Sequence, residues 1–214
     1  MAEIIVDPGS THMGKLKYAK EHIDNAWRAG AHIIKFQLFS NPKGYEGGNI
    51  ELPLKWWDEL VAYANKRIQV TASVFDEDKL NFLISKEPQY IKFAYSKKLE
   101  SKWIDKCIRA DIFPIVSCDV MTDHLISKDT IRLYCIPEYP VRYEIAFDSI
   151  FPRFDGFSDH TLGIRQSVRA FQAGAKWVEK HTTLKHSDVN CPDNSFAVSY
   201  SEIEKLASQF RAPY

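Results

Sequence analysis

The sequence predicts an α/β protein of the (β/α)8 TIM barrel class, with residues 1–214 forming a single domain. Three observations carry this prediction. Short apolar runs recur along the chain, and each is followed by a more polar segment. Most of the polar segments have apolar residues at the three- and four-residue spacing of an amphipathic helix. No low-complexity stretch or linker divides the chain. Such alternation predicts a parallel sheet covered by helices, and eight units predict closure; an open doubly wound sheet is the alternative.

Taken in order, the apolar runs predict strands at residues 3–7, 31–37, 68–74, 90–94, 113–118, 131–136, 154–158 and 176–181. The periodic segments predict helices at residues 16–29, 54–67, 76–85, 102–110, 164–173 and 201–210. Residues 121–129 and 144–150 leave room for only about two helical turns each, so we expect short helices after strands five and six. Residues 41–49 are rich in glycine and predict a mobile loop after the second strand.

Composition indicates an ordinary globular protein, with 45% hydrophobic and 26% charged residues. Lysine plus arginine equals aspartate plus glutamate, at 28 each, so no net charge favours nucleic acid or an anionic membrane surface. The N-terminus lacks a basic segment followed by an apolar run, and no apolar stretch approaches the length of a membrane span. We therefore expect a cytoplasmic protein that binds neither nucleic acid nor membrane.

Two histidines lie near the predicted ends of the last two strands. His160 follows the seventh apolar run and His181 ends the eighth, one strand-helix-strand unit later. Adjacent parallel strands lie about 4.8 Å apart, so both imidazoles could face one cation. The alternative is that both rings are simply hydrogen-bonded into the fold. Ser158 and Glu179 share the faces of these histidines, and a carboxylate inside a barrel requires a cation or donors. The pattern therefore predicts a two-histidine metal site.

The alternation of side chains along the strands predicts a polar barrel interior. Lys35 and Gln37 point one way while Ile34 and Phe36 point the other. We expect the apolar set to face the helices and the polar set to face inward, at Glu3, Lys35, Gln37, Lys92, Ser158, His160, Glu179 and His181. Together these groups could bind an anionic, oxygen-rich substrate with a divalent ion, although unrelated surface charges are the alternative.

Several motifs occur in a fixed order along nearly the whole chain. They are Ala2-Glu3-Ile4, Thr11-His12-Met13-Gly14, Lys35-Phe36-Gln37, Ser73-Val74-Phe75-Asp76, Lys92, Glu138-Tyr139-Pro140, the Ser158 to Gly163 segment, Glu179-Lys180-His181 and Pro192-Asp193. This ordered set resembles the N-acetylneuraminate (sialic acid) synthase family. The resemblance implies a (β/α)8 catalytic barrel that condenses phosphoenolpyruvate with an N-acylmannosamine-like aldehyde. The products implied are a nonulosonic acid and phosphate.

The resemblance also implies roles for individual residues. A divalent ion, Mn²⁺ or Mg²⁺, is expected on His160 and His181, where it would act as a Lewis acid on the aldehyde oxygen. Catalytic roles are implied for Glu3, Glu179 and Lys92, with either carboxylate serving as base or electrostatic stabiliser. Substrate contacts are implied for Lys35, Gln37, Ser73, Tyr139, Ser158 and Asp193.

This sequence departs from the family pattern near the expected ligand. Tyr95 and Lys97 stand where the family usually has a serine and an acid, and Pro137 replaces a polar residue. These changes indicate an altered aldose acceptor. The chain ends at Tyr214, so we expect it to lack the family's C-terminal antifreeze-like domain and to act as a homodimer or with a partner that supplies the domain. A non-catalytic or partner-subunit relative, and a metal-dependent aldolase or isomerase that does not use phosphoenolpyruvate, remain alternatives.

Overall fold

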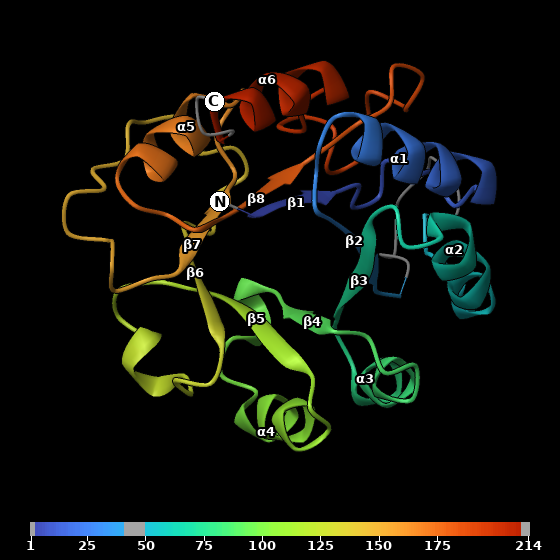
Figure 1. The fold of residues 1–214 in the computed structure, drawn as a ribbon, viewed down its shortest axis with the longest axis horizontal. Helices are drawn as coiled ribbons and strands as arrows, with labels where there is room; N and C mark the ends of the chain where they lie inside the picture. The colour runs from blue at the N-terminus through green and yellow to red at the C-terminus, as the bar shows by residue number, and fades with distance from the viewer. Residues whose placement is uncertain (1–2, 41–49, 211–214) are drawn as a thin grey trace.

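Eight parallel strands form a closed barrel in the computed structural model, which describes residues 3–40 and 50–210 (Figure 1). β1 pairs with both β2 and β8, and this pairing closes the sheet. The strands are β1 (Glu3–Asp7), β2 (Ile33–Leu38), β3 (Gln69–Val74), β4 (Tyr90–Phe93), β5 (Phe113–Cys118), β6 (Ile131–Cys135), β7 (Gly156–Asp159) and β8 (Trp177–His181). The predicted fold class is confirmed. The loop predicted at residues 41–49 lies outside the described residues.

Helices surround the barrel, as Figure 1 shows down its axis. They are α1 (Leu16–Arg28), α2 (Trp57–Ala64), α3 (Glu77–Ile84), α4 (Ser101–Arg109), α5 (Arg165–Gln172) and α6 (Tyr200–Phe210). The helix predicted at residues 54–67 is shorter, because a 3-10 turn, η1 (Leu54–Trp56), precedes it and left-handed Asn65 and Lys66 end it. Among the described residues, no helix is long and apolar enough to cross a membrane.

Of the short helices predicted after strands five and six, the first is reduced to one 3-10 turn and the second is not formed. A single 3-10 turn, η3 (Asp123–Leu125), follows β5, and the fully described stretch 136–155 between β6 and β7 contains no helix. Prolines 137, 140 and 152 interrupt this second stretch, and each removes a backbone donor that a helix needs. Arg153 donates to both carboxylate oxygens of Asp123, at 2.6 and 2.5 Å, and so fastens the two connections to each other. Buried apolar side chains of the two connections, rather than helices, cover that side of the barrel, namely Ile126, Ile145, Phe147, Ile150 and Phe154.

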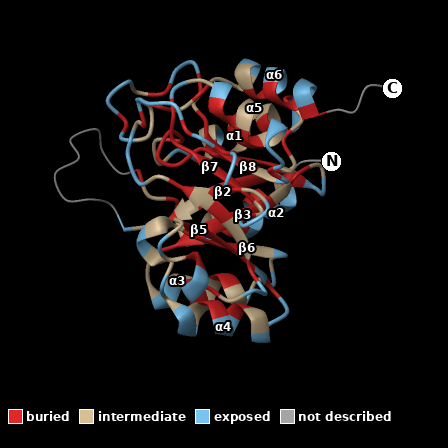
Figure 2. Ribbon diagram, turned by 90° about the vertical axis from the view of Figure 1, so that its left-hand side faces the viewer, coloured by how far each residue is buried: buried red, intermediate tan, exposed pale blue. Residues whose placement is uncertain are grey.

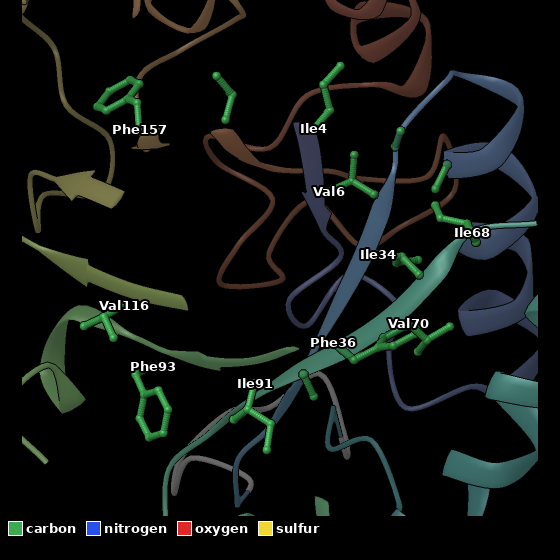
Figure 3. Packing of buried hydrophobic residues seen from close by; sticks show 14 of the residues in the cluster. Ile4, Val6, Ile34, Phe36, Ile68, Val70, Ile91, Phe93, Val116 and Phe157 are labelled. Carbon is green, nitrogen blue, oxygen red and sulfur yellow. The ribbon is translucent and has the colours of Figure 1, made fainter. Parts of the chain in front are cut away.

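The strands divide their side chains as the alternation predicts. Ile4, Val6, Ile34, Phe36 and Ile91 are fully buried on the outer face of the sheet, in the core between strands and helices (Figure 3). A separate apolar cluster fills the N-terminal half of the barrel interior, at Ile5, Ile33, Ile115 and Leu133. Buried residues therefore run through the middle of the molecule (Figure 2), and the polar inward residues are left for the C-terminal half.

Candidate active site

A cavity of about 300 Å³ opens at the C-terminal ends of the strands. It is lined by most of the residues singled out from the sequence, namely Lys35, Gln37, Ser73, Lys92, Tyr139, Ser158, His160, Glu179, His181 and Asp193. Asp7, Phe75, Ala94, Tyr95, Ser96, Ser117, Cys135 and Pro137 complete the lining. Catalytic sites of (β/α)8 barrels lie at this end, so the cavity is the candidate active site.

Two lysines and a glutamate form the floor of the cavity. Glu179 lies 3.8 Å from the Lys35 ammonium and 3.5 Å from the Lys92 ammonium, and all three side chains are at most 5% exposed. Ser158 donates a hydrogen bond of 2.8 Å to Glu179, and Lys92 donates one of 2.7 Å to Ser117. Such buried charges are tolerated only when paired, and here each one is.

The charge balance of this floor differs between the two lysines. Burial favours the neutral form of Lys35, but Asp7 and Glu179 outweigh it and raise the Lys35 pKa above its ordinary value. Burial lowers the pKa of Lys92, and the Glu179 carboxylate only partly opposes this effect. Burial also disfavours ionised Glu179, yet the two lysines hold its pKa below the ordinary value. The protonated form is therefore favoured more strongly for Lys35 than for Lys92.

Asp7 is a site residue that the sequence interpretation missed. It ends β1, is fully buried, and accepts hydrogen bonds from Lys35 at 2.5 Å and from Gln37 at 2.9 Å. Burial opposes its ionisation, but Lys35 and, when its ring is protonated, His181 outweigh burial and hold the Asp7 pKa well below its ordinary value. Its position at the C-terminal end of a predicted strand was the signal that could have identified it.

Glu3 does not belong to the site, and its predicted catalytic role is wrong. It begins β1 at the opposite end of the barrel, where it pairs with Trp177, the first residue of β8. Its carboxylate is 40% exposed and lies 3.7 Å from His32. Four residues along a strand correspond to about 13 Å, so the inward face alone did not determine which end of the barrel Glu3 occupies.

The two predicted metal-binding histidines do come together. The ring centroids of His160 and His181 are 5.7 Å apart, and both rings are nearly buried. His160 Nδ1 lies 3.0 Å from the carbonyl oxygen of Ile136, so this nitrogen carries the proton and Nε2 keeps its lone pair. Burial, reinforced by His181, lowers the pKa of His160 to about 3, and its ring is neutral at pH 7. A neutral imidazole with a fixed tautomer is suited to binding a metal.

Comparison with known proteins identifies the family of this barrel. Residues 45–213 match the NeuB family. The chain belongs to the NeuB family. The spore coat polysaccharide biosynthesis protein SpsE of Bacillus subtilis is 28% identical over 97% of this chain, and the match spans 66% of that relative, about two thirds of its length. An N,N'-diacetyllegionaminic acid synthase of Campylobacter jejuni is 29% identical over 97% of this chain and 75% of its own.

A solved structure agrees with the architecture of this NeuB-family chain. The N-acetylneuraminic acid synthetase of Leptospira borgpetersenii, crystallised with citrate, superposes with a TM-score of 0.84 over 97% of this chain and 82% of that one. Its sequence is 24% identical to this chain, so the likeness concerns the fold.

The donor set of this NeuB-family site fits a divalent cation held by two imidazoles. His181 lies between two carboxylates, with Nε2 3.3 Å from Asp7 and Nδ1 3.5 Å from Asp193. Among the described residues, no group of three or more histidine, cysteine, aspartate or glutamate side chains is arranged to hold a metal ion. His160 and His181 would hold the ion, and water and substrate would complete its coordination, as in a site that keeps open positions.

Asp193 is fixed by the loop that follows β1. The Ser10 amide donates to Asp193 Oδ2 at 2.7 Å, and the Ser10 hydroxyl donates to the same oxygen. Gly9 has a φ of +52°, and a Cβ there would lie 2.5 Å from that oxygen. The loop therefore accepts the carboxylate only because residue 9 has no side chain.

Of the three residues that depart from the family pattern, two line the cavity and one does not. The Tyr95 ring lines the cavity, and its hydroxyl donates to Asp119. This hydrogen bond and partial burial raise the pKa of Tyr95 to about 12, so the phenol stays neutral. Pro137 also lines the cavity, whereas Lys97 does not and instead lies 3.8 Å from Glu100. Tyr95 and Pro137 are thus the departures that shape the ligand space.

Proposed function

We propose that this NeuB-family barrel condenses phosphoenolpyruvate with a sugar aldehyde, with a divalent Mn²⁺ or Mg²⁺ ion as cofactor, to give a nonulosonic acid and inorganic phosphate. The observation that carries the proposal is the pair of buried lysines, Lys35 and Lys92, on either side of Glu179 beneath two adjacent histidines. Paired ammonium groups suit the phosphate and carboxylate of a small phosphorylated acid. The relative from Campylobacter jejuni, named as a legionaminic acid synthase, supports the same class of reaction.

The charges around the cavity support a cation cofactor. Three carboxylates line it, from Asp7, Glu179 and Asp193, against the two lysines. A trianionic substrate would meet an excess of negative charge there, and a divalent ion reverses that excess. His160 and His181 would hold such an ion, which would supply Lewis-acid polarisation of the aldehyde oxygen.

The protein groups then have separate tasks. The C2–C3 π electrons of phosphoenolpyruvate form the bond from C3 to the aldehyde carbon, and the aldehyde oxygen takes up a proton. Water then adds at C2 and loses one proton, and the bond between C2 and the phosphate oxygen breaks, so that inorganic phosphate leaves with the second proton and C2 becomes a ketone. Lys35, Lys92, Ser73 and Ser158 bind and orient the phosphorylated acid. Glu179, already held by Ser158, stabilises positive charge that develops at C2 or takes the proton of the attacking water. Asp7, which accepts a hydrogen bond from Gln37, has the role that was expected for Glu3, as a carboxylate beside the sugar aldehyde.

The acceptor side supports an aldose other than N-acylmannosamine. The ring of Tyr95 and the apolar ring of Pro137 face the cavity, and neither offers a charge. Tyr139 stacks on His160 with ring centroids 4.2 Å apart, so it forms the wall beside the aldehyde position. We also propose that the protein acts as a homodimer or with a partner subunit that covers this end of the barrel.

Phosphate release tests the function. Purified protein with phosphoenolpyruvate, Mn²⁺ and a panel of aldoses should release inorganic phosphate only when a suitable aldose is present. His160→Ala should abolish release, whereas His186→Ala, at a half-exposed residue paired with Glu21, should retain it. Unchanged release from His160→Ala would contradict the role given to the histidines. Binding of phosphoenolpyruvate without release, for every aldose, would instead favour a non-catalytic partner subunit.

A further inference from the structure

The His181 ring carries a buried nitrogen with no hydrogen-bond partner among the described residues. This atom is Nδ1, and the nearest acceptor is Asp193 Oδ1 at 3.5 Å. On the other side of the ring, Nε2 lies 3.3 Å from Asp7 Oδ2. A neutral imidazole has one N–H and one lone pair, so only one of the two carboxylates can receive its proton.

The hydrogen bonds already made by the two carboxylates decide between them. Asp7 Oδ2 accepts from both Lys35 and Gln37, and Asp7 Oδ1 accepts from the Gly9 amide at 2.8 Å. Asp193 uses only Oδ2, which accepts from Ser10. No described residue donates to Asp193 Oδ1, which faces His181. The open acceptor is therefore on the Asp193 side of the ring.

We propose that Asp193 is a positioning residue that holds His181 as the Nδ1–H tautomer, so that the Nε2 lone pair faces the cation site. This inference deepens the proposed function and rests on it for the cation. Ser10 supports this arrangement because it binds the oxygen that Asp193 does not use for His181, and Gly9 leaves room for that oxygen. His160 reaches the same state through the carbonyl oxygen of Ile136, so both rings present Nε2.

Asp193→Asn gives a sharp test because the Ser10 amide can donate only to an oxygen. The amide oxygen of the new side chain must stay on Ser10, and its NH₂ group then faces His181 Nδ1. That contact favours a lone pair on Nδ1 and a proton on Nε2, the reverse of the proposed native tautomer. Asp188→Asn is the matched control, since Asp188 lies in the same loop and its carboxylate accepts, among the described residues, from the Asn190 amide at 2.9 Å and not from a histidine.

The tautomer can be read from the imidazole ¹⁵N chemical shifts in metal-free protein at pH 8, with His181→Asn used for assignment. We expect Nδ1–H in the native protein and in Asp188→Asn, and Nε2–H in Asp193→Asn. Identical tautomers in the native protein and Asp193→Asn would overturn the proposal, as would an Nε2–H tautomer in the native protein.

Mn²⁺ affinity, measured by electron paramagnetic resonance, separates this inference from the proposed function. We expect Asp193→Asn to bind Mn²⁺ about 10- to 100-fold more weakly than the native protein, and Asp188→Asn to match it. If native protein binds Mn²⁺ and Asp193→Asn binds it equally well, the positioning role is wrong while the metal site stands. If the tautomer reverses as expected but native protein binds no Mn²⁺, the metal part of the proposed function is wrong and the positioning role stands.

Discussion

The two acidic residues of β1, Glu3 and Asp7, show that position along a strand determines whether an inward side chain reaches the cavity. Glu3 and Asp7 have the same parity on the strand, so both were compatible with the inward face, but only Asp7 lies at the C-terminal edge. The alternation of side chains correctly selected Lys35, Lys92 and Glu179, which lie along the middle of their strands. It could not select between two acids on one short strand, because parity gives the face of a residue and not its height in the barrel.

Asp7→Asn and Glu3→Gln should therefore behave differently. The first removes the charge beside Lys35 and Gln37, and we expect phosphate release to fall by about 100-fold or more. It also leaves buried Lys35 with Glu179 as its remaining carboxylate, 3.8 Å away, at a cost of about 3 kcal/mol in unfolding free energy. Glu3→Gln should change unfolding free energy by less than about 0.5 kcal/mol and leave activity intact. Equal losses in both variants would refute this assignment.

At the scale of elements, β7 and β8 are joined by a buried ion pair on their outer face. Lys180 and Asp159 are both fully buried, with 3.4 Å between the ammonium and the carboxylate. Lys180 also donates to the carbonyl oxygen of Thr161, and Ser167 donates to Asp159 at 2.5 Å. Because Asp159 precedes His160 and Lys180 precedes His181, this pair fixes the two strand ends that carry the histidines.

Lys180→Met should lower the free energy of unfolding by about 3 to 5 kcal/mol, because it leaves the Asp159 carboxylate buried without its cation. Urea denaturation measures the effect, and Lys185→Met, at an exposed residue in the following loop, is the control. The double variant Lys180→Met with Asp159→Asn should recover part of the loss, since it leaves no unpaired charge. Additive losses in the double variant would mean that the two groups do not interact.

Element types were predictable from the sequence except where tertiary contacts decide them. The six α-helices and eight strands of the described residues follow from periodicity, whereas the connections after β5 and β6 are shaped by tertiary contacts such as that of Arg153 with Asp123, thirty residues away in sequence. Local propensity carries no information about such a contact. The location of the cavity was also predictable from the sequence, because the C-terminal ends of the strands meet at one end of any parallel barrel.

At the scale of the whole molecule, three buried histidines link stability to pH. Burial, chiefly, lowers the pKa of His12 to about 4 and the pKa values of His22 and His160 to about 3. Their pKa values in the unfolded chain are about 6.5. Since the folded pKa values are lower, the unfolded state binds more protons below pH 6.5, and stability present above that pH is lost as the pH falls.

We expect the metal-free protein to be about 4 kcal/mol less stable at pH 5.5 than at pH 7.5, as three such histidines require. Urea denaturation at the two pH values, in the presence of a chelator, measures the difference. His22→Gln should reduce the difference by about one third, because one of the three linked protons is removed. A change in stability of under about 1 kcal/mol between the two pH values would show that these rings take up protons in the folded state.

The apolar cluster of Ile5, Ile33, Ile115 and Leu133 fills the barrel below the lysines, so among the described residues the cavity is closed at that end. Whatever lies against Lys35 and Lys92 is then covered by whatever lies beside Tyr139 at the entrance. With the substrates of the proposed function, we expect phosphoenolpyruvate to bind to the lysines before the aldose binds. It should be unable to dissociate while the aldose remains bound. Kinetics of this protein should accordingly show compulsory order, with a dead-end aldose analogue trapping the acid inside.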